Sequence, residues 1–324
     1  MHEITVVIPN YNGKGYLDDC LTALSKQDFA PGFETLVVDN GSTDGSVELL
    51  REKWGDVQTV LLPENTGFCH AVNVGIEKSD SPFVILLNND TKVKAGFIKE
   101  LYNSITQDEK IFSVSAQMLM WDEPEYIDDA GDRYCVMGWA FSRGKGKRRE
   151  DYNKPCEVFA ACGGAAIYRK SIFDEIGLFD ELHFAYLEDI DIGYRAKIFG
   201  YRNLYEPGAQ VIHYGSASSG SRYNAWKTEI AAANNIYLVG KNMPFLQLLI
   251  NLPFLFVGFF LKFLFFCKKR MGKIYLKGIA AGFRKLFSKD GRKRIVRFLP
   301  ANFGHYFGIQ MQLYANAIRI IKKS

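Results

Sequence analysis

Val37-Val38-Asp39-Asn40-Gly41-Ser42-Thr43-Asp44-Gly45-Ser46 is typical of a β-strand that ends in a polar turn and leads into a helix. Three other junctions in the first 91 residues have the same character: Pro9-Asn10-Tyr11-Asn12-Gly13, Glu64-Asn65-Thr66-Gly67 and Asn88-Asn89-Asp90-Thr91. Because the carboxyl ends of parallel strands meet at one edge of a sheet, these four polar loops predict a single site at that edge.

Apolar runs and helical stretches alternate around these junctions. Strands are expected at Ile4–Ile8, Glu34–Val38, Gln58–Leu62 and Phe83–Leu87, and helices at Tyr16–Gln27, Ser46–Trp54 and Cys69–Lys78. Alternation at this spacing predicts an α/β fold with a mostly parallel sheet flanked by helices. Residues 121–160 are expected to be irregular. The basic run from Arg143 to Arg149 is interpreted as a solvated loop rather than a phosphate clamp, because it lacks the strand and ending of a P-loop.

Composition excludes several classes of protein. The chain has 324 residues, of which 48% are apolar and 23% charged, so disordered, collagen-like and disulfide-built chains are ruled out. The six cysteines form no CxxC pair and are interpreted as cytosolic thiols. No secretory signal is expected, since Met1 leads directly into a strand-like run.

The net charge of +4 conceals two unlike parts. Residues 1–267 contain 25 Lys and Arg against 35 Asp and Glu, whereas residues 268–324 contain 15 against Asp290 alone. The apolar run from Met243 to Cys267 precedes this basic tail and is about long enough to cross a bilayer. Such a tail can meet a membrane or a nucleic acid. We favour an anionic membrane and expect no nucleic-acid partner, because no base-reading module accompanies the tail.

The apolar run could span the membrane or lie in it. If the N-terminal part is cytoplasmic, one crossing would export the basic residues, against the positive-inside tendency. In addition, Asn251, Pro253 and Lys262 interrupt the run. A monotopic or re-entrant element is therefore favoured, with Ile274–Phe287 and Ile309–Lys323 as interfacial amphipathic helices. The predicted organisation is an α/β domain over 1–235 and a helical membrane-associating region over 236–324.

The residues alone leave the roles of the polar loops open. Asp39 could accept hydrogen bonds from a ribose or base, or only form a turn. The first loop lacks G-x-G-x-x-G, which weakens the case for a dehydrogenase. Asp90 could help hold Mg²⁺ or Mn²⁺ against a diphosphate, or be the N-cap of a following helix.

Taken together, the four motifs resemble those of the family 2 glycosyltransferases, which have the GT-A fold and use nucleotide-diphosphate sugars. The resemblance implies that Asn88-Asn89-Asp90 stands at the family's DxD position. Two of these three residues are amides, and Asn89 is left to hydrogen-bond the ribose. Asp90 then supplies the carboxylate for the metal, and metal dependence is expected to be weak or incomplete. The donor-binding set implied is Pro9, Asn10, Tyr11, Asn12, Asp39, Asn65, Gly67, Asn88, Asn89 and Asp90.

A second segment, residues 160–202, contains the expected catalytic residues. Glu188, Asp189 and Asp191 crowd the start of a predicted helix, where the helix dipole favours acids. Inverting glycosyl transfer needs one general base, for which we choose Asp189. The Glu-Asp-Ile-Asp-Ile-x-x-Arg string also resembles the family's acceptor-side motif. The acceptor-side set is Gly163, Gly164, Glu188, Asp191 and Arg195, although Asp191 and Arg195 can equally be an ordinary pair on the helix surface.

His213 follows an apolar run and precedes a small-residue loop, Gly215–Arg222. It is either structural or, as the resemblance implies, a ligand of the metal or diphosphate; the loop could close over the donor. The resemblance thus implies that residues 1–235 are a GT-A glycosyltransferase domain, and that the protein is an inverting glycosyltransferase acting on a lipid-linked or polysaccharide acceptor at the cytoplasmic face of a bacterial membrane. The tail and the Asn-Asn-Asp variant resemble bacterial rhamnosyltransferases, so dTDP-rhamnose is the expected donor, with UDP-hexose or UDP-galactofuranose as alternatives. A non-catalytic nucleotide-sugar binder is the alternative function, and the oligomeric state is not predicted.

Overall fold

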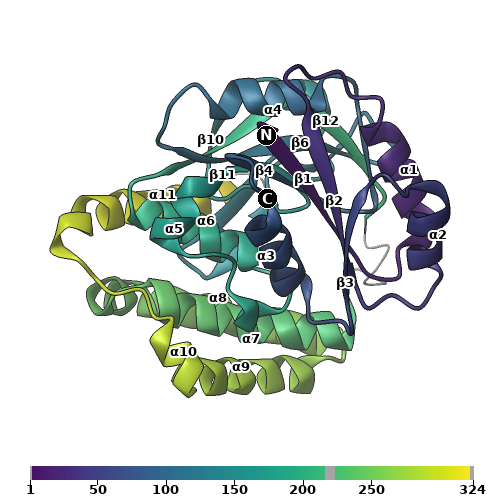
Figure 1. Ribbon diagram of the computed structural model, residues 1–324. Coiled ribbons are helices and arrows are strands. Elements are labelled where there is room, and N and C mark those ends of the chain that lie inside the picture. Colours follow the sequence, from purple (N-terminus) through teal and green to yellow (C-terminus); the bar gives the residue numbers. More distant parts are fainter. Residues whose placement is uncertain (1, 216–222, 322–324) are drawn as a thin grey trace.

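The computed structural model describes residues 2–215 and 223–321, and a large sheet forms its centre (Figure 1). The strands are β1 (Ile4–Asn10), β2 (Phe33–Asn40), β3 (Gln58–Leu62), β4 (Phe83–Leu87), β5 (Thr91–Val93), β6 (Ile111–Met120), β7 (Ile127–Asp129), β8 (Asp132–Cys135), β9 (Trp139–Ser142), β10 (Cys156–Val158), β11 (Ala165–Arg169) and β12 (Arg202–His213). The helices are α1 (Lys14–Leu24), α2 (Ser46–Lys53), α3 (Phe68–Lys78), α4 (Phe97–Ile105), α5 (Lys170–Ile176), α6 (Glu188–Ile198), α7 (Ala225–Asn242), α8 (Phe245–Lys268), α9 (Gly272–Phe287), α10 (Lys289–Lys293) and α11 (Phe303–Ile321).

The main path of the sheet runs β10-β12-β6-β11-β4-β1-β2-β3. Strands β3, β2, β1 and β4 are parallel neighbours, and β6 and β12 form a second parallel pair. Antiparallel β11 lies between β4 and β6 and joins the two parts. The predicted α/β fold with a mostly parallel sheet is therefore confirmed, as are the four strands and three helices expected in the first 87 residues.

Each face of the sheet carries its own apolar core, because side chains alternate along a strand. Ile4, Val6 and Ile8 of β1 pack with α1 and α4 on one face. Val7 packs with α3, α5 and α6 on the other. Strand β4 is buried along its whole length, as its continuous apolar sequence predicts for a strand in the centre of a sheet. With both faces covered, the carboxyl ends of β1, β2 and β4 are left to form a site.

The expectation of an irregular segment over residues 121–160 is wrong in part. Strands β7, β8, β9 and β10 all lie within it. Each is three or four residues long, too short for a periodic pattern, and β7 and β10 are fixed by pairing with β6 and β12. The β8–β9 hairpin pairs Asp132 with Ser142 and lies outside the main sheet.

The C-terminal helices form a layer of their own. Figure 1 shows α7, α8 and α9 side by side at one end of the sheet, and α7 and α8 both contact α9. A shared core joins this layer to the rest, because Leu238, Leu255 and Leu313 pack with Tyr134 and Tyr194. The expected helical C-terminal region is present. Our proposed division at residues 235 and 236 falls within α7.

In helix α8 polar side chains are buried and large apolar side chains are exposed, the reverse of the usual distribution in a soluble protein. Gln247 and Asn251 are buried and hydrogen-bond with Gln310 of α11, while Phe245 and Phe256 are 80% and 71% exposed. Among the described residues, α8 is the one helix long and apolar enough to cross a membrane, and 17% of its most apolar window is buried.

Candidate active site

A cleft of about 990 Å³ opens at the carboxyl ends of the parallel strands. Twelve of the predicted site residues line it: Pro9, Asn10, Tyr11, Asn65, Asn88, Asn89, Asp90, Gly163, Gly164, Glu188, Asp189 and His213. The other five, which are Asn12, Asp39, Gly67, Asp191 and Arg195, are not among its lining residues. The two predicted segments, residues 9–90 and 163–213, therefore meet in one cavity.

Three strands are tied together beneath the donor side of the cleft. Asn10 at the end of β1 donates from Nδ2 to Asp39 at 2.8 Å, and Asn89 donates to Asn10 Oδ1 at 2.6 Å. Asp39 is 1% exposed and also accepts from the Ser42 amide at 2.9 Å. The turn expected at Asp39 is thus formed, and its carboxylate fixes Asn10 from below the cleft.

Two further contacts fix the loops on either side. Asn12, at φ 50°, accepts from the Thr43 amide at 2.8 Å, which joins the first and second loops. Gly13 lies so close to Asn89 that a Cβ atom would approach its Nδ2 to 1.9 Å, so only glycine fits. Gly67, at φ 93°, accepts from Asn40 Nδ2 at 3.1 Å and abuts the ring of Phe184.

Asp90 and His213 meet because β5 and β12 pair, with His213 opposite Thr91. His213 Nε2 lies 3.3 Å from the Asp90 carboxylate, and its Nδ1 lies 2.8 Å from Asp128. Burial opposes the charge on His213, but the two carboxylates outweigh it and raise the pKa of His213 to about 9. The alternative that Asp90 is a helix N-cap is wrong, since β5 follows it. Asp90 and His213 could together hold a divalent cation at the cleft once the cation displaces the proton from His213, because metal binding releases protons from its ligands.

Asp189 lines the same cleft and has a second carboxyl group beside it. Asp132 of β8 forms a side-chain hydrogen bond with Asp189, and the Ile190 amide donates to Asp189 Oδ1 at 2.7 Å. Burial raises the pKa of Asp189, and the hydrogen bond from Asp132 offsets part of this rise. Burial and the charges of Asp129 and Asp189 raise the pKa of Asp132 well above its usual range. Asp132 therefore keeps its proton and uses it to donate a hydrogen bond to Asp189.

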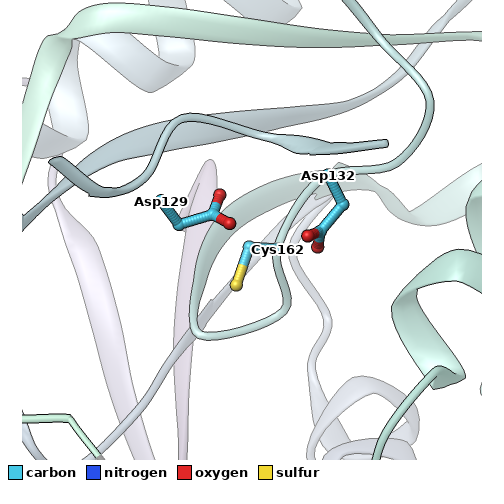
Figure 2. A group of neighbouring side chains, drawn as sticks. All are labelled: Asp129, Asp132 and Cys162. Carbon is cyan, nitrogen blue, oxygen red and sulfur yellow. The ribbon is translucent and has the colours of Figure 1, made fainter. Parts of the chain in front are cut away.

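One carboxyl oxygen of Asp129, one of Asp132 and the Sγ atom of Cys162 lie within 4.8 Å of one another (Figure 2). Burial raises the pKa of Asp129 to about 7 and that of the Cys162 thiol well above its usual range. Protonated groups are poor ligands for Mg²⁺ or Mn²⁺, which prefer charged or carbonyl oxygens. We therefore interpret this cluster as a hydrogen-bonding support for Asp189. Neighbouring Gly164 accepts from the Asn88 amide at 2.9 Å and so joins β11 to the donor side.

A left-handed turn presents the Glu188-Asp189 pair. Phe184, Tyr186 and Leu187 have φ of 62°, 69° and 67°, a strained conformation for large side chains. Asn234 of α7 donates to the carbonyls of His183, Ala185 and Tyr186, each at 2.8 Å. The C-terminal layer thus holds the turn that orients the proposed base. Burial and then Asp189 raise the pKa of Glu188 to about 8, so Glu188 is mostly protonated at neutral pH.

Asp191 and Arg195 do not line the cleft, where the acceptor-side prediction had placed them. The alternative, an ordinary ion pair on the helix surface, is also wrong, because the pair is buried. They do pair, at 2.9 Å, but their side chains are 0% and 5% exposed. Lys241 of α7 lies 2.8 Å from Asp191 and 2.7 Å from Asp180. Asp180, Asp191 and His183 could otherwise be taken for a metal site. The ammonium group of Lys241 already pairs with both acids. Asp191 therefore joins α6 to α7, whereas Arg195 joins α6 to the end of α5 through the carbonyls of Gly177 and Leu178.

Several residues of the site were missed. Asp128 and Asp132 lie within residues 121–160, which were expected to be irregular, and their spacing matches no motif used in the sequence analysis. Trp226 of α7 is 48% exposed in the cleft, with the rings of Phe184 and Tyr186 at 6.2 and 5.8 Å. Exposed aromatic faces of this kind suit contact with a sugar ring. The proposed closing loop lies largely outside the described residues.

A parallel sheet with a polar cleft, a carboxylate–imidazole pair on one side and a buried carboxyl pair on the other defines a group-transfer enzyme of the GT-A type. The sequence comparison specifies the family. Residues 5–177 match the model of glycosyl transferase family 2, and the chain belongs to this family. It is a glycosyltransferase.

Among curated relatives, the chain is 27% identical over 246 residues to an N-acetylglucosaminyl-diphospho-decaprenol L-rhamnosyltransferase of Mycobacterium tuberculosis, covering 67% of this chain and 78% of the relative. Among solved structures, it is similar to GalNAc-T7 with UDP, GalNAc and Mn²⁺, with a TM-score of 0.60, 18% identity, and coverage of 74% of this chain and 47% of the other. It is also similar to a mannosyltransferase from Pyrobaculum calidifontis in complex with GDP-Man and Mn²⁺, with a TM-score of 0.53, 18% identity, and coverage of 89% and 88%. These structural likenesses support the GT-A fold.

Proposed function

We propose that the protein transfers a sugar from a nucleotide-diphosphate donor, with inversion, to a lipid-linked acceptor at a membrane surface. The observation that carries this proposal is that Asp189, Asp90 and His213 all line one cleft. In such a cleft the acceptor and the leaving diphosphate can lie on opposite sides of the sugar, as inversion requires. The mycobacterial relative's name supports a lipid-diphosphate acceptor and a rhamnose donor.

Asp189 is the proposed base. The acceptor oxygen attacks the anomeric carbon of the donor, the bond from that carbon to the diphosphate oxygen breaks, and the acceptor proton passes to Asp189. Burial raises the pKa of Asp189, which makes it a stronger base than an exposed aspartate, and the hydrogen bond from Asp132 offsets part of this rise. Glu188, largely protonated, is the poorer candidate.

Asp90 and His213 are the proposed ligands of a Mg²⁺ or Mn²⁺ ion. Their convergence at 3.3 Å in the cleft wall, with Asp128 orienting the imidazole, fits a carboxylate–histidine site that leaves other positions for diphosphate and water. The ion would offset charge on the leaving diphosphate. Asn10, Asn65 and Asn89 would then face the nucleoside.

The reaction is tested with the full chain in detergent, Mg²⁺ or Mn²⁺, and an N-acetylglucosaminyl-diphospho-lipid acceptor. We expect dTDP-rhamnose to be used at least about tenfold faster than UDP-hexoses or UDP-galactofuranose, which corresponds to about 1.4 kcal/mol of discrimination. NMR of the product should show an inverted anomeric centre. A retained configuration would reject the mechanism, and donor binding with neither transfer nor hydrolysis would indicate a non-catalytic binder.

The Asp189→Asn variant tests the base. General-base catalysis contributes about 10²–10⁴-fold, so transfer should fall by about that factor while donor binding is kept. Asp56→Asn, in an exposed turn, is the matched control and should behave as wild type. Near-normal transfer by Asp189→Asn would show that another group takes the proton.

We further propose that α8 lies along the membrane surface. It is packed against the protein along its length: Gln247 accepts from Tyr194 at 2.9 Å, and the Gly258 carbonyl accepts from the Trp139 indole at 3.0 Å. A helix held in this way cannot cross a bilayer without drawing the β8–β9 hairpin into it. Its outward face, which includes Leu249 and Phe256, is apolar and exposed, as for an interfacial helix.

Vesicle binding tests this attachment. Leu249→Glu/Phe256→Glu should weaken binding to phosphatidylcholine–phosphatidylglycerol vesicles at least about tenfold, since two buried apolar side chains are each worth about 1.5–3 kcal/mol. Leu61→Glu, at an exposed apolar position of β3, is the control. Equal binding by both would place the membrane contact elsewhere.

A further inference from the structure

A second cavity, of about 370 Å³, lies between the β8–β9 hairpin, the adjoining basic loop, α8 and α11. Six cationic side chains line it: Arg133, Arg143, Lys145, Lys147, Lys262 and Arg319. None of the described residues that line it is acidic. The basic run that the sequence suggested to be a solvated loop therefore forms one wall of a cationic pocket.

Most of this positive charge is not neutralised by the protein. Lys145 pairs with Asp128, and Arg143 lies over the ring of Tyr152 at 4.7 Å. Arg133 and Lys262 are half-buried, and in the ion pairs recorded over residues 2–215 and 223–321 neither has a carboxylate partner. Burial lowers the pKa of Arg133, and the like charges of Arg319 and Arg143 lower it further. Cations brought together in this way are stabilised when an anion joins them.

The pocket lies beside the proposed membrane-facing surface. Lys262 belongs to α8 and follows Leu261, which is 44% exposed; Arg319 belongs to α11 and follows Ile318, which is 53% exposed. At a bilayer surface, apolar side chains enter the acyl region while lipid phosphates lie level with neighbouring Lys and Arg. A lipid whose chains meet these apolar residues would have its phosphate within reach of the pocket.

We propose that this pocket binds the phosphate group of a membrane lipid, with Arg133 and Lys262 as its inner contacts and Lys147 and Arg319 at its rim. The proposal rests on the proposed membrane attachment. The phosphate can come from an anionic phospholipid or from the diphosphate of the lipid-linked acceptor. Either would hold the protein against the bilayer at the point where the Trp139 indole already joins the hairpin to α8.

The test uses the full chain and two charge-matched pairs of substitutions. Arg133→Gln/Lys262→Gln should weaken binding to phosphatidylglycerol-containing vesicles by about 25-fold, at about fivefold per charge. Lys26→Gln/Lys99→Gln removes the same charge from exposed positions of the catalytic region and should change binding less than about twofold. If the first pair unfolds the protein, the exposed Lys147→Gln/Arg319→Gln pair replaces it.

The two lipid sources give different results. If the phospholipid is the ligand, vesicle binding falls as described; if the acceptor is the ligand, its KM rises at least about tenfold while vesicle binding is kept. Both results support the pocket. Loss of inorganic diphosphate binding with neither lipid effect would show a site for soluble anions and overturn the proposal, as would equal behaviour of pocket and control variants. Binding of the wild type to uncharged phosphatidylcholine vesicles tests the apolar face of α8 separately from the pocket. Donor hydrolysis by the wild type tests the proposed function separately.

Discussion

Asn234 Nδ2 lies 2.8 Å from the carbonyl oxygen of Ala185, so a helix of the C-terminal layer holds the backbone four residues before Asp189. The same amide reaches the carbonyls of His183 and Tyr186, and Lys285 of α9 donates to its Oδ1 at 2.6 Å. The proposed membrane-facing layer is therefore also a structural support of the catalytic turn.

Asn234→Ala should slow transfer by at least about tenfold and destabilise the fold. The left-handed turn loses its donors, and unpaired buried carbonyls cost about 1–3 kcal/mol. Steady-state kinetics and urea unfolding measure the two effects. Asn103→Ala, on the exposed side of α4, is the control. Normal kinetics in a destabilised Asn234→Ala protein would mean that the turn does not need this support.

Asp132 should influence the ionisation of Asp189 through their hydrogen bond. In Asp132→Leu the carboxylate loses a donor, so the pKa of Asp189 rises and the acid limb of the kcat/KM profile moves upward by about one pH unit. Asp132→Asn keeps a neutral donor and should retain most activity. Identical profiles for the two variants would show that no proton is shared.

Asp128 should set the metal affinity through His213. It is 2.8 Å from Nδ1 and so favours the imidazole orientation that turns Nε2 toward Asp90. Removing such a partner typically lowers metal affinity about 10–100-fold. Calorimetric Mn²⁺ titration of Asp128→Asn, without substrates, measures this loss. Asp122→Asn, exposed in the same segment, should bind as wild type; if both bind alike, Asp128 does not orient the ligand.

His183 should make the fold sensitive to acid. Burial lowers the pKa of His183 to about 4, although Asp191 opposes this effect, and the usual value is 6.5. Between these values the unfolded chain binds the proton and the folded chain does not, so stability falls as pH falls from about 6.5 toward 4. The loss between pH 7 and 5 is on the order of 2 kcal/mol. Urea unfolding of His183→Gln should show a smaller loss, whereas exposed His2→Gln should match the wild type. Equal losses in all three would assign the acid sensitivity to other groups.

The sequence predicted the parts of the site that depend on local chemistry. Polar loops after apolar runs, such as the one at Asp39, mark strand ends whatever the distant contacts are, and so the donor edge and the family could be recognised. Asp189 was predicted as the base because it belongs to a dense motif. Asp128 and Asp132 could not be found in this way, since they act through partners 85 and 57 residues away on other strands and helices.

The same limit explains the errors. The i,i+4 spacing of Asp191 and Arg195 is the same whether the helix face is exposed or buried, so the sequence cannot distinguish the two. The face is buried here because α7 packs against it and places Lys241 next to Asp191. The basic run from Arg143 likewise became part of a pocket only where α8 and α11 approach it.

The sequence by itself determined the α/β fold, the donor edge, the family and the division between an acidic catalytic part and a basic, apolar tail, because periodicity, turn chemistry and charge are local properties. The tertiary structure decided which acids share protons, which pairs are buried, and that the tail packs against the catalytic turn through Asn234. These properties depend on burial and on contacts between distant segments, which no local pattern contains.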